Sequence, residues 1–491
     1  MVSGVTERMG SQYMGGVETA AGHCANDCKK VSVSQKPDNA LSCLDAYIDA
    51  FQALPEGVRE AEVNAQTHEA TDITVKNGKI AGIQASSQTV LFIRVNKDRT
   101  GYMYTEDLTE DASQILKRAL DNSSCSDREE ADRLNQERRL FACDEGEAQK
   151  DLNVLEQAAA RMEKALLEEA RIISQVHVSL KAETVAQRTV NSYGRDISFR
   201  FPLYLMRVTA NGTDGKRKYS FSYLRTASNP ENFNTAEYLE NLEAGLETQM
   251  NPEPSFPSGE YQVVLDKAVV RNIFVTAWQL FSGVKYADGA SALCGLLSSK
   301  VGGRMLNITD YPSHPSSGFV FLGDCEGTVG EPVKLIHRGV LEGLMTNRSS
   351  AAALGLKPTG NAGRRPLLSG NIATDILVTP RNLVIEPGES DIETLLEHMG
   401  EGIYITTSYD VFHTVNISSG DFCIPCKGVR IRNGKRAEHL SSLHISGNMR
   451  ELLSRVEEVG RELYLSPMED LENYGIGACD LRLSSCMVSG E

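Results

Sequence analysis

Val263-Val264-Leu265-Asp266 begins the stretch of this sequence that decides its fold. Six further short signatures follow it along the chain, the last of them ending at Asn448. They are Ser291-Ala292-Leu293, Asn307-Ile308-Thr309-Asp310, Cys325-Glu326-Gly327-Thr328, Thr359-Gly360-Asn361-Ala362, Asn416 through Gly420-Asp421-Phe422-Cys423, and Ser446-Gly447-Asn448. No single signature is specific, but their order along the second half of the chain is. We therefore assign them to one C-terminal domain.

A proline-rich segment separates this domain from the first half of the chain. Residues 251–259 contain three prolines, which remove backbone donors and favour an extended linker. At 491 residues the chain is too long for one ordinary core. We predict an α+β protein with an N-terminal domain over 39–250 and a Gly-rich, mainly antiparallel β domain over 260–485.

The N-terminal domain is predicted as α/β, with a mixed or antiparallel sheet and long helices. Asn77-Gly78 lies between β-type runs at 72–76 and 79–83 and predicts a tight hairpin. Further strands are expected at 90–95 and 101–104, and Asn211-Gly212 predicts another hairpin turn within 185–225. Apolar residues recur at helical spacing over 152–176, which predicts a long amphipathic helix.

Other segments are assigned from capping signals, apolar spacing and composition. Further helices are predicted at 41–54, 111–120, 236–249, 268–281, 392–399 and 449–459. Residues 1–38 have weak periodicity and are expected to form a poorly ordered extension. The mixed charges of 121–150 predict a solvated linker or an exposed helix inserted in the N-terminal domain.

Composition limits the partners and the location that we expect. A net charge of −16 argues against nucleic acid as a direct partner. No apolar run approaches the roughly 18 residues that span a bilayer, so we expect no membrane contact. The 11 cysteines are scattered and odd in number, which is typical of a reduced protein. We expect a cytoplasmic location.

The histidines do not form a zinc motif of the metallopeptidase type. A helical His-Glu-x-x-x-His motif projects two imidazoles and a carboxylate toward one bound metal ion. Only His439 and His444 lie close together here, and no acidic residue stands between them. His68-Glu69 lacks a second histidine at the required spacing. The sequence therefore excludes this type of site.

Cys423-Ile424-Pro425-Cys426 is the remaining candidate for chemistry. The spacing of its cysteines suits a metal ion or a redox disulfide, and His413 lies ten residues upstream of Cys423. Two thiolates and one distant imidazole do not complete a four-ligand site. We interpret Cys423 and Cys426 as structural or incidental. A metal site of Cys423, Cys426 and His413 and a redox disulfide stay open as alternatives.

Together the ordered signatures resemble the C-terminal domain of the TldD/PmbA family, metallopeptidases once called modulators of DNA gyrase. In TldD-type subunits a His-Glu-x-x-x-His helix precedes the Ser-Ala element and supplies zinc ligands and a general base. The equivalent stretch here, residues 275–283, contains no histidine and no carboxylate. Gly420-Asp421-Phe422-Cys423 is similar to the Gly-Asp-Phe-Ser pattern of PmbA-type subunits, although TldD-type subunits place a zinc-binding cysteine near Cys423.

The resemblance covers roughly residues 45 to 485 and implies a PmbA/TldE-like subunit without catalytic residues or bound zinc of its own. The zinc would lie in a TldD-like catalytic partner. The two subunits would form a heterodimer, or this chain a homodimer, around a chamber in which small flexible peptides are cut or matured. Two other hypotheses stay open: a self-sufficient hydrolase with the Cys423, Cys426 and His413 site, and a non-enzymatic binding regulator. No substrate-binding residue is assigned.

Overall fold

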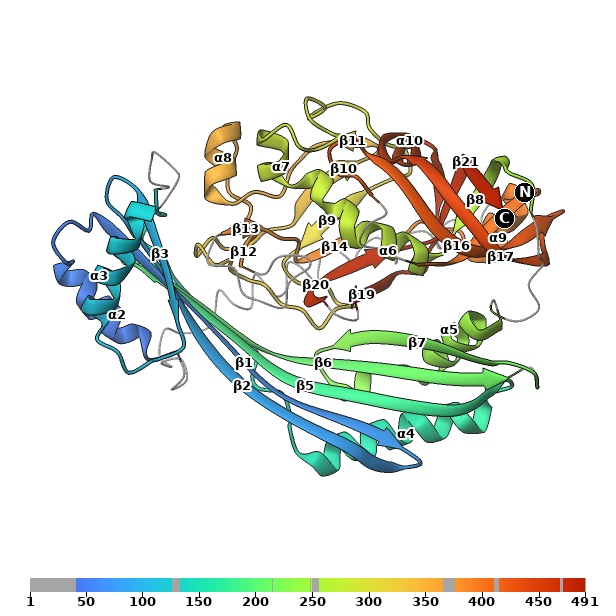
Figure 1. Ribbon diagram of the computed structural model, residues 1–491, viewed down its shortest axis with the longest axis horizontal. Coiled ribbons are helices and arrows are strands. Elements are labelled where there is room, and N and C mark those ends of the chain that lie inside the picture. The colour runs from blue at the N-terminus through green and yellow to red at the C-terminus, as the bar shows by residue number, and fades with distance from the viewer. Residues whose placement is uncertain are drawn as a thin grey trace, which may run out of the picture.

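A computed structural model describes residues 41–125, 133–213, 215–247, 249, 256–364, 376–409, 415–468 and 471–490. A long curved sheet forms the N-terminal half, and the C-terminal half lies over its concave side (Figure 1). The predicted extension over 1–38, residues 251–255 of the predicted linker and His413 lie outside the described residues. No helix of the described part is both long and apolar enough to cross a membrane.

Within the described residues, the N-terminal sheet has seven strands in the order β3-β2-β1-β5-β6-β4, and β7 also pairs with β6. Only the β4–β6 pairing is parallel. The strands are β1 (Glu60–Lys76), β2 (Lys79–Asn96), β3 (Thr100–Thr105), β4 (Leu140–Asp144), β5 (Ile173–Asn191), β6 (Asp196–Thr213) and β7 (Lys218–Ala227). The helices are α2 (Leu44–Ala50), α3 (Ala112–Asn122), α4 (Leu152–Glu169) and α5 (Thr235–Glu247).

The central strands of this sheet bury both faces, because side chains alternate along a strand. Leu155 and Met162 of α4 pack with Leu180 and Met206 on the outer face. On the inner face, Phe201 belongs to a cluster that includes residues of the C-terminal half. The inner face is thus covered by the second half of the chain.

The C-terminal half contains, in its described residues, two six-stranded sheets and the pair β12-β13. One sheet has the order β11-β10-β9-β14-β20-β19 and the other β17-β16-β15-β8-β21-β18. Their strands are β8 (Gly259–Leu265), β9 (Ile308–Tyr311), β10 (Val333–His337), β11 (Val340–Leu341), β14 (Asn382–Ile385), β15 (Gly402–Ser408), β16 (Asp421–Arg432), β17 (Lys435–Asn448), β18 (Val456–Val459), β19 (Tyr464–Met468), β20 (Leu471–Ala478) and β21 (Leu481–Gly490). β12 is Ala362–Gly363 and β13 is Leu377–Val378.

Short helices connect these strands. They are α6 (Lys267–Ala277), α7 (Gly283–Ala287), α8 (Arg348–Leu354), α9 (Ile392–Met399) and α10 (Met449–Ser454), and a 3₁₀ turn at Trp278–Phe281 joins α6 to α7. Most strand pairings are antiparallel, but β14–β20 and β15–β8 are parallel. The predicted α+β class is therefore confirmed, and α9 has the bounds that the sequence predicted.

Several predicted elements differ from the structure at their ends. The helix predicted over 152–176 ends at Glu169, because Ile173 and Val176 are buried in β5. The helix predicted over 449–459 ends at Ser454, because Val456 and Val459 pair with β21. The hairpins predicted within 185–225 are present, because β6 pairs antiparallel with both β5 and β7. The turn position at Asn211-Gly212 is wrong, since β6 continues through it to Thr213.

The prediction of a linker or exposed helix for 121–150 is also wrong over Leu140–Asp144, which form β4. This strand pairs its backbone with β6 while most of its side chains stay accessible. Main-chain pairing of this kind needs no apolar pattern, so composition did not reveal it. Likewise, the runs predicted at 79–83 and 90–95 form one strand, β2.

Candidate functional site

Residues 275–283, where a TldD-type subunit would carry its zinc motif, form the end of α6, the 3₁₀ turn and the first residue of α7. Val275, Ala277 and Phe281 are buried in the core of the C-terminal half. Asp266 begins α6 by accepting a hydrogen bond from the backbone N–H of Ala268 at 2.8 Å. Across the described residues, no three His, Cys, Asp or Glu side chains gather where they could hold a metal ion. The large side chains of this stretch pack in the core of the C-terminal half.

Cys423 and Cys426 lie on β16, opposite Ser446 and Leu443 of β17, with no bulge between them. Residues three apart on a strand point to opposite faces of the sheet. Accordingly, Cys423 is exposed, whereas Cys426 is buried in the core. Both are free cysteines. This strand geometry does not bring the two thiols onto one metal ion or into a disulfide.

Two of the ordered signatures meet at Asp310, on β9. Its Oδ2 accepts hydrogen bonds from Asn361 Nδ2 at 2.7 Å and from Arg381 Nε at 3.0 Å. Its Oδ1 accepts the backbone N–H of Arg381 at 2.8 Å. All three residues are buried, so the Arg381 guanidinium compensates the Asp310 charge. The polar residues of these signatures therefore fix loops against one another.

The Cys325-Glu326-Gly327-Thr328 signature joins the two halves of the chain. Glu326 Oε1 accepts from Arg94 Nη1 at 3.1 Å, and Arg94 Nη2 donates to Glu62 Oε1 at 2.8 Å. The side chains of all three residues are at most 2% exposed. Beside them, burial and the nearby Glu326 charge raise the pKa of Asp324 to about 7. A buried ion network thus ties β1 and β2 to the C-terminal half.

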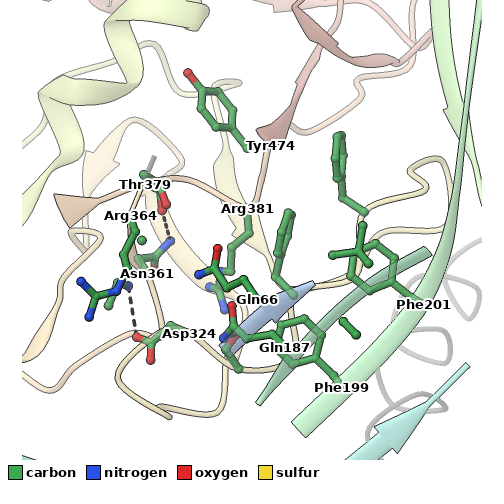
Figure 2. A pocket seen from close by; sticks show the side chains of 18 of the residues that line it. Gln66, Gln187, Phe199, Phe201, Asp324, Asn361, Arg364, Thr379, Arg381 and Tyr474 are labelled. Carbon is green, nitrogen blue, oxygen red and sulfur yellow. Dashed lines mark hydrogen bonds between the residues drawn. The ribbon is translucent and has the colours of Figure 1, made fainter. Parts of the chain in front are cut away.

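A cavity of about 110 Å³ lies between the inner face of the N-terminal sheet and loops of the C-terminal half (Figure 2). Strand register builds its sheet wall in rows. Gln66, Gln187 and Phe199 form one row, and His68, Val185 and Phe201 form the next. Phe199 and Phe201 therefore lie along β6, and the amides and the imidazole lie toward β1. Figure 2 shows the two glutamines between the phenyl rings and residues Asp324, Asn361 and Arg364.

His68 and Glu183 form an ordered pair in this wall. His68 Nδ1 lies 2.7 Å from Glu183 Oε1, and Lys181 Nζ lies 3.0 Å from Glu183 Oε2. Burial alone would raise the pKa of Glu183, but the hydrogen bond with His68 and the Lys181 charge lower it to about 2. Glu183 is therefore ionised at neutral pH and holds the His68 ring in place.

Tyr474 of β20 closes the cavity on the side of the C-terminal half. Its hydroxyl points away from the cavity in Figure 2 and accepts a hydrogen bond from Trp278 Nε1 at 3.1 Å. One hydrogen bond therefore connects residues 275–283 to the cavity. The sequence alone does not reveal this cavity, because its residues come from strands and loops far apart in the chain. The available signal was the alternation that places Glu183 and Gln187 on one face of their strand and Phe199 and Phe201 on one face of the next.

Family models match along most of the chain. The model for the PmbA/TldA metallopeptidase domain 1 matches residues 61–123, and the model for the central domain matches 147–244. The model for the C-terminal domain matches residues 258–490, the part that contains the ordered signatures. The chain belongs to the PmbA/TldD metallopeptidase family. In this PmbA/TldD protein the first two matched domains share one continuous sheet, because β1 pairs with β5 over their length.

Curated relatives of this PmbA/TldD protein are metalloproteases. A zinc metalloprotease TldD homologue of Saccharolobus solfataricus is 31% identical over 239 residues, which cover 48% of this chain and 51% of that protein. This chain thus matches about half the length of that relative. A metalloprotease of Methanothermobacter thermautotrophicus is 24% identical over 453 residues, 87% of this chain and 91% of that protein.

Solved structures share the fold of this PmbA/TldD protein. TldE from Thermococcus kodakarensis superposes with a TM-score of 0.74 at 17% identity, covering 91% of this chain and 100% of that chain. A structure described as a putative modulator of DNA gyrase from Bacteroides thetaiotaomicron gives a TM-score of 0.75 at 18% identity, covering 93% and 100%. At these sequence identities the structural similarity establishes the fold and does not establish the activity.

Proposed function

We propose that this chain is a PmbA/TldE-like, non-catalytic subunit of a TldD/PmbA-type metallopeptidase complex. It would bind no metal itself and would form part of a chamber in which small flexible peptides are cleaved or matured. The catalytic zinc would lie in a TldD-like partner in a heterodimer; a homodimer is the alternative assembly. The scattered cysteines support action in the cytoplasm. The net charge of −16 argues against direct contact with nucleic acid.

The observation that carries this proposal is the chemistry of residues 275–283. Zinc-dependent hydrolysis requires imidazole or carboxylate ligands and a base beside the bound water. This stretch supplies Val275, Thr276, Trp278 and further apolar or amide side chains, and its large side chains are packed into the core. A metal could enter only if that packing were lost. The alternative ligands Cys423 and Cys426 point to opposite faces of β16.

Co-purification tests the assembly. The chain, carrying an affinity tag, is co-expressed with a TldD-like protein that has an intact His-Glu-x-x-x-His motif. We expect the partner to co-purify and the complex to cleave a fluorogenic unstructured peptide. Cleavage should disappear when the first histidine of the partner's motif is replaced by alanine. A complex that cleaves equally well with that partner variant would contradict the proposal.

The chain alone tests the competing hydrolase hypothesis. We expect the purified chain to retain less than about a tenth of an equivalent of zinc after dialysis. A protein zinc site would hold the metal tightly through dialysis, so a low zinc content would show that the chain has none. We also expect no peptide cleavage. Cleavage by the chain alone, abolished by a chelator and by Cys423→Ser, would instead support the atypical metal site.

A further inference from the structure

The cavity between the sheet and the C-terminal half has an apolar side and a polar side. On the apolar side, Phe201 meets Phe321 edge-on at 6.1 Å, and Phe319 stacks on Phe321 at 5.6 Å. Aromatic rings prefer such edge-to-face and offset contacts at about 4.5–7 Å between centroids. A further ring placed against Phe199 and Phe201 would extend the same arrangement.

The size of the cavity limits the occupant to a single ring. Its volume is about 110 Å³. An apolar cavity of about 150 Å³ in another protein takes up one benzene molecule. Protein interiors rarely leave voids larger than a water molecule, so this space at the junction of the two halves is a candidate site for a small occupant.

The polar side limits the charge of the occupant. Glu183 is paired with His68 and Lys181, and Arg381 is paired with Asp310. Arg364 also lines the cavity, and its positive charge acts on the buried Glu62. Asp324 accepts backbone N–H groups of Glu326, Thr328 and Ala362. An added charge would therefore lose its hydration without gaining a counterion among these groups. Gln66 Nε2 donates to Asn64 Oδ1 at 3.0 Å and Gln187 Nε2 donates to the Gly323 carbonyl at 3.4 Å, so the two amide oxygens can accept a hydrogen bond from a neutral donor such as a hydroxyl.

We propose that this cavity binds one neutral aromatic ring carrying a hydrogen-bonding group, such as a phenol. The ring packs against Phe199 and Phe201, and its polar group reaches Gln187 and Gln66. The ring can belong to the tyrosine side chain of a flexible peptide or to a free small aromatic molecule. Binding is a property of this chain alone, so it does not depend on a peptidase partner.

Trp278 provides a direct readout of this site. It is the single tryptophan of the sequence, and its Nε1 donates to the hydroxyl of Tyr474, which lines the cavity. The two rings are 6.0 Å apart at 74°. A ligand that contacts Tyr474 should therefore change the tryptophan emission of the protein.

The purified full chain is titrated with N-acetyl-tyrosinamide and, separately, with p-cresol, with tryptophan emission and calorimetry as readouts. We expect saturable binding. Val185→Phe places an extra ring in the cavity and should abolish it. Gln187→Met keeps the side-chain length but removes the amide, and should weaken binding up to about tenfold, the value of one hydrogen bond. Gln84→Met, on the exposed part of β2, is the matched control and should bind normally.

The outcomes separate the two sources of the ring. Saturation by both probes supports a peptide side chain, because a ring that carries backbone groups can then enter, and saturation by p-cresol alone supports a site for free small aromatics. Thermal unfolding shows whether each variant is folded; if Val185→Phe is not, Gln187→Met decides. The absence of saturable binding by either probe overturns the proposal. Binding that neither Val185→Phe nor Gln187→Met changes also overturns it, because the ligand would then lie elsewhere.

Discussion

Asp266 and Asp480 are two buried carboxyls at the beginning of α6. Asp480 Oδ1 accepts the backbone N–H of Lys267 at 2.9 Å, and Tyr404 donates its hydroxyl to Asp266 Oδ2 at 2.6 Å. Burial, together with their mutual repulsion, raises the pKa of Asp480 to about 8, and burial also raises the pKa of Asp266. The folded protein therefore binds more protons here than the unfolded chain over much of the accessible pH range.

This proton uptake predicts a pH-dependent stability. The ordinary aspartate pKa is near 3.8 and the folded value for Asp480 is near 8, so stability should fall as pH rises between these values and level off above them. Asp480→Asn keeps an oxygen acceptor for Lys267 but removes the ionisation. We expect its melting temperature to decline less than that of the wild type between pH 5 and pH 8, measured by thermal unfolding at about 0.1 M salt.

Asp391 supplies the control for this prediction. It caps α9 by accepting the N–H of Thr394 at 2.9 Å, and its hydrogen bonds from Thr394 lower its pKa. Its titration is therefore complete below pH 5, and asparagine is an equally good cap. The melting temperature of Asp391→Asn should therefore fall above pH 5 as steeply as that of the wild type. If the melting temperature of Asp480→Asn falls with pH as steeply as that of Asp391→Asn, the buried carboxyls do not cause the pH dependence of stability.

At the scale of elements, the β1–β2 hairpin is held by a contact with α4. Glu163 accepts the backbone N–H of Asn77 on Oε1 at 2.7 Å and that of Gly78 on Oε2 at 2.6 Å. Both turn residues have positive φ, 54° and 70°, as a tight hairpin with this sequence requires. Glu163 is 3% exposed, although it lies on a helix. The carboxylate thus joins the helix to the turn.

Replacing Glu163 should loosen that connection. Glu163→Ala removes two charge-assisted hydrogen bonds but leaves donors that can reach water, so we expect a loss of about 1–3 kcal/mol in the free energy of unfolding. Urea denaturation measures it. Glu168→Ala, on the exposed side of the same helix, should change stability by at most about 0.5 kcal/mol. Equal effects of the two substitutions would show that the turn contact contributes nothing.

At the scale of the whole molecule, the buried Glu62–Arg94–Glu326 network connects the two halves of the chain. Removing one member of a buried ion network leaves uncompensated charge and costs about 3–5 kcal/mol. We expect this loss for Arg94→Met in urea unfolding followed by circular dichroism and by Trp278 emission. Because the network joins the halves, the midpoints from the two signals should also separate.

Arg432→Met is the control for charge loss in general. Arg432 pairs with Glu438 at 3.0 Å on the surface, where an ion pair contributes at most about 1 kcal/mol. Its two midpoints should stay together and close to the wild-type values. An Arg94→Met protein that behaves like Arg432→Met would mean that the network does not couple the halves.

Local features of this protein could be predicted from the sequence because their causes lie within a few residues. The Asn77-Gly78 turn follows from left-handed backbone angles that these residues adopt readily, and α9 follows from its cap at Asp391 and its apolar spacing. The ordered signatures indicated the family, and the missing ligands in 275–283 could be seen directly. The helix ends at Glu169 and Ser454 could not be predicted in this way, because the next apolar residues belong to strands whose partners lie far along the chain.

Only the tertiary structure decided which side chains form a site. His68, Val185 and Phe201 come from three strands and become neighbours through strand register, which the sequence does not specify over such distances. Register also places Cys423 and Cys426 on opposite faces, although their spacing suggested a shared ligand. By itself, the sequence indicated the family and showed that residues 275–283 contain no histidine and no carboxylate, since both depend on which residues are present. The cavity and the ion network that joins the halves depend on which surfaces meet.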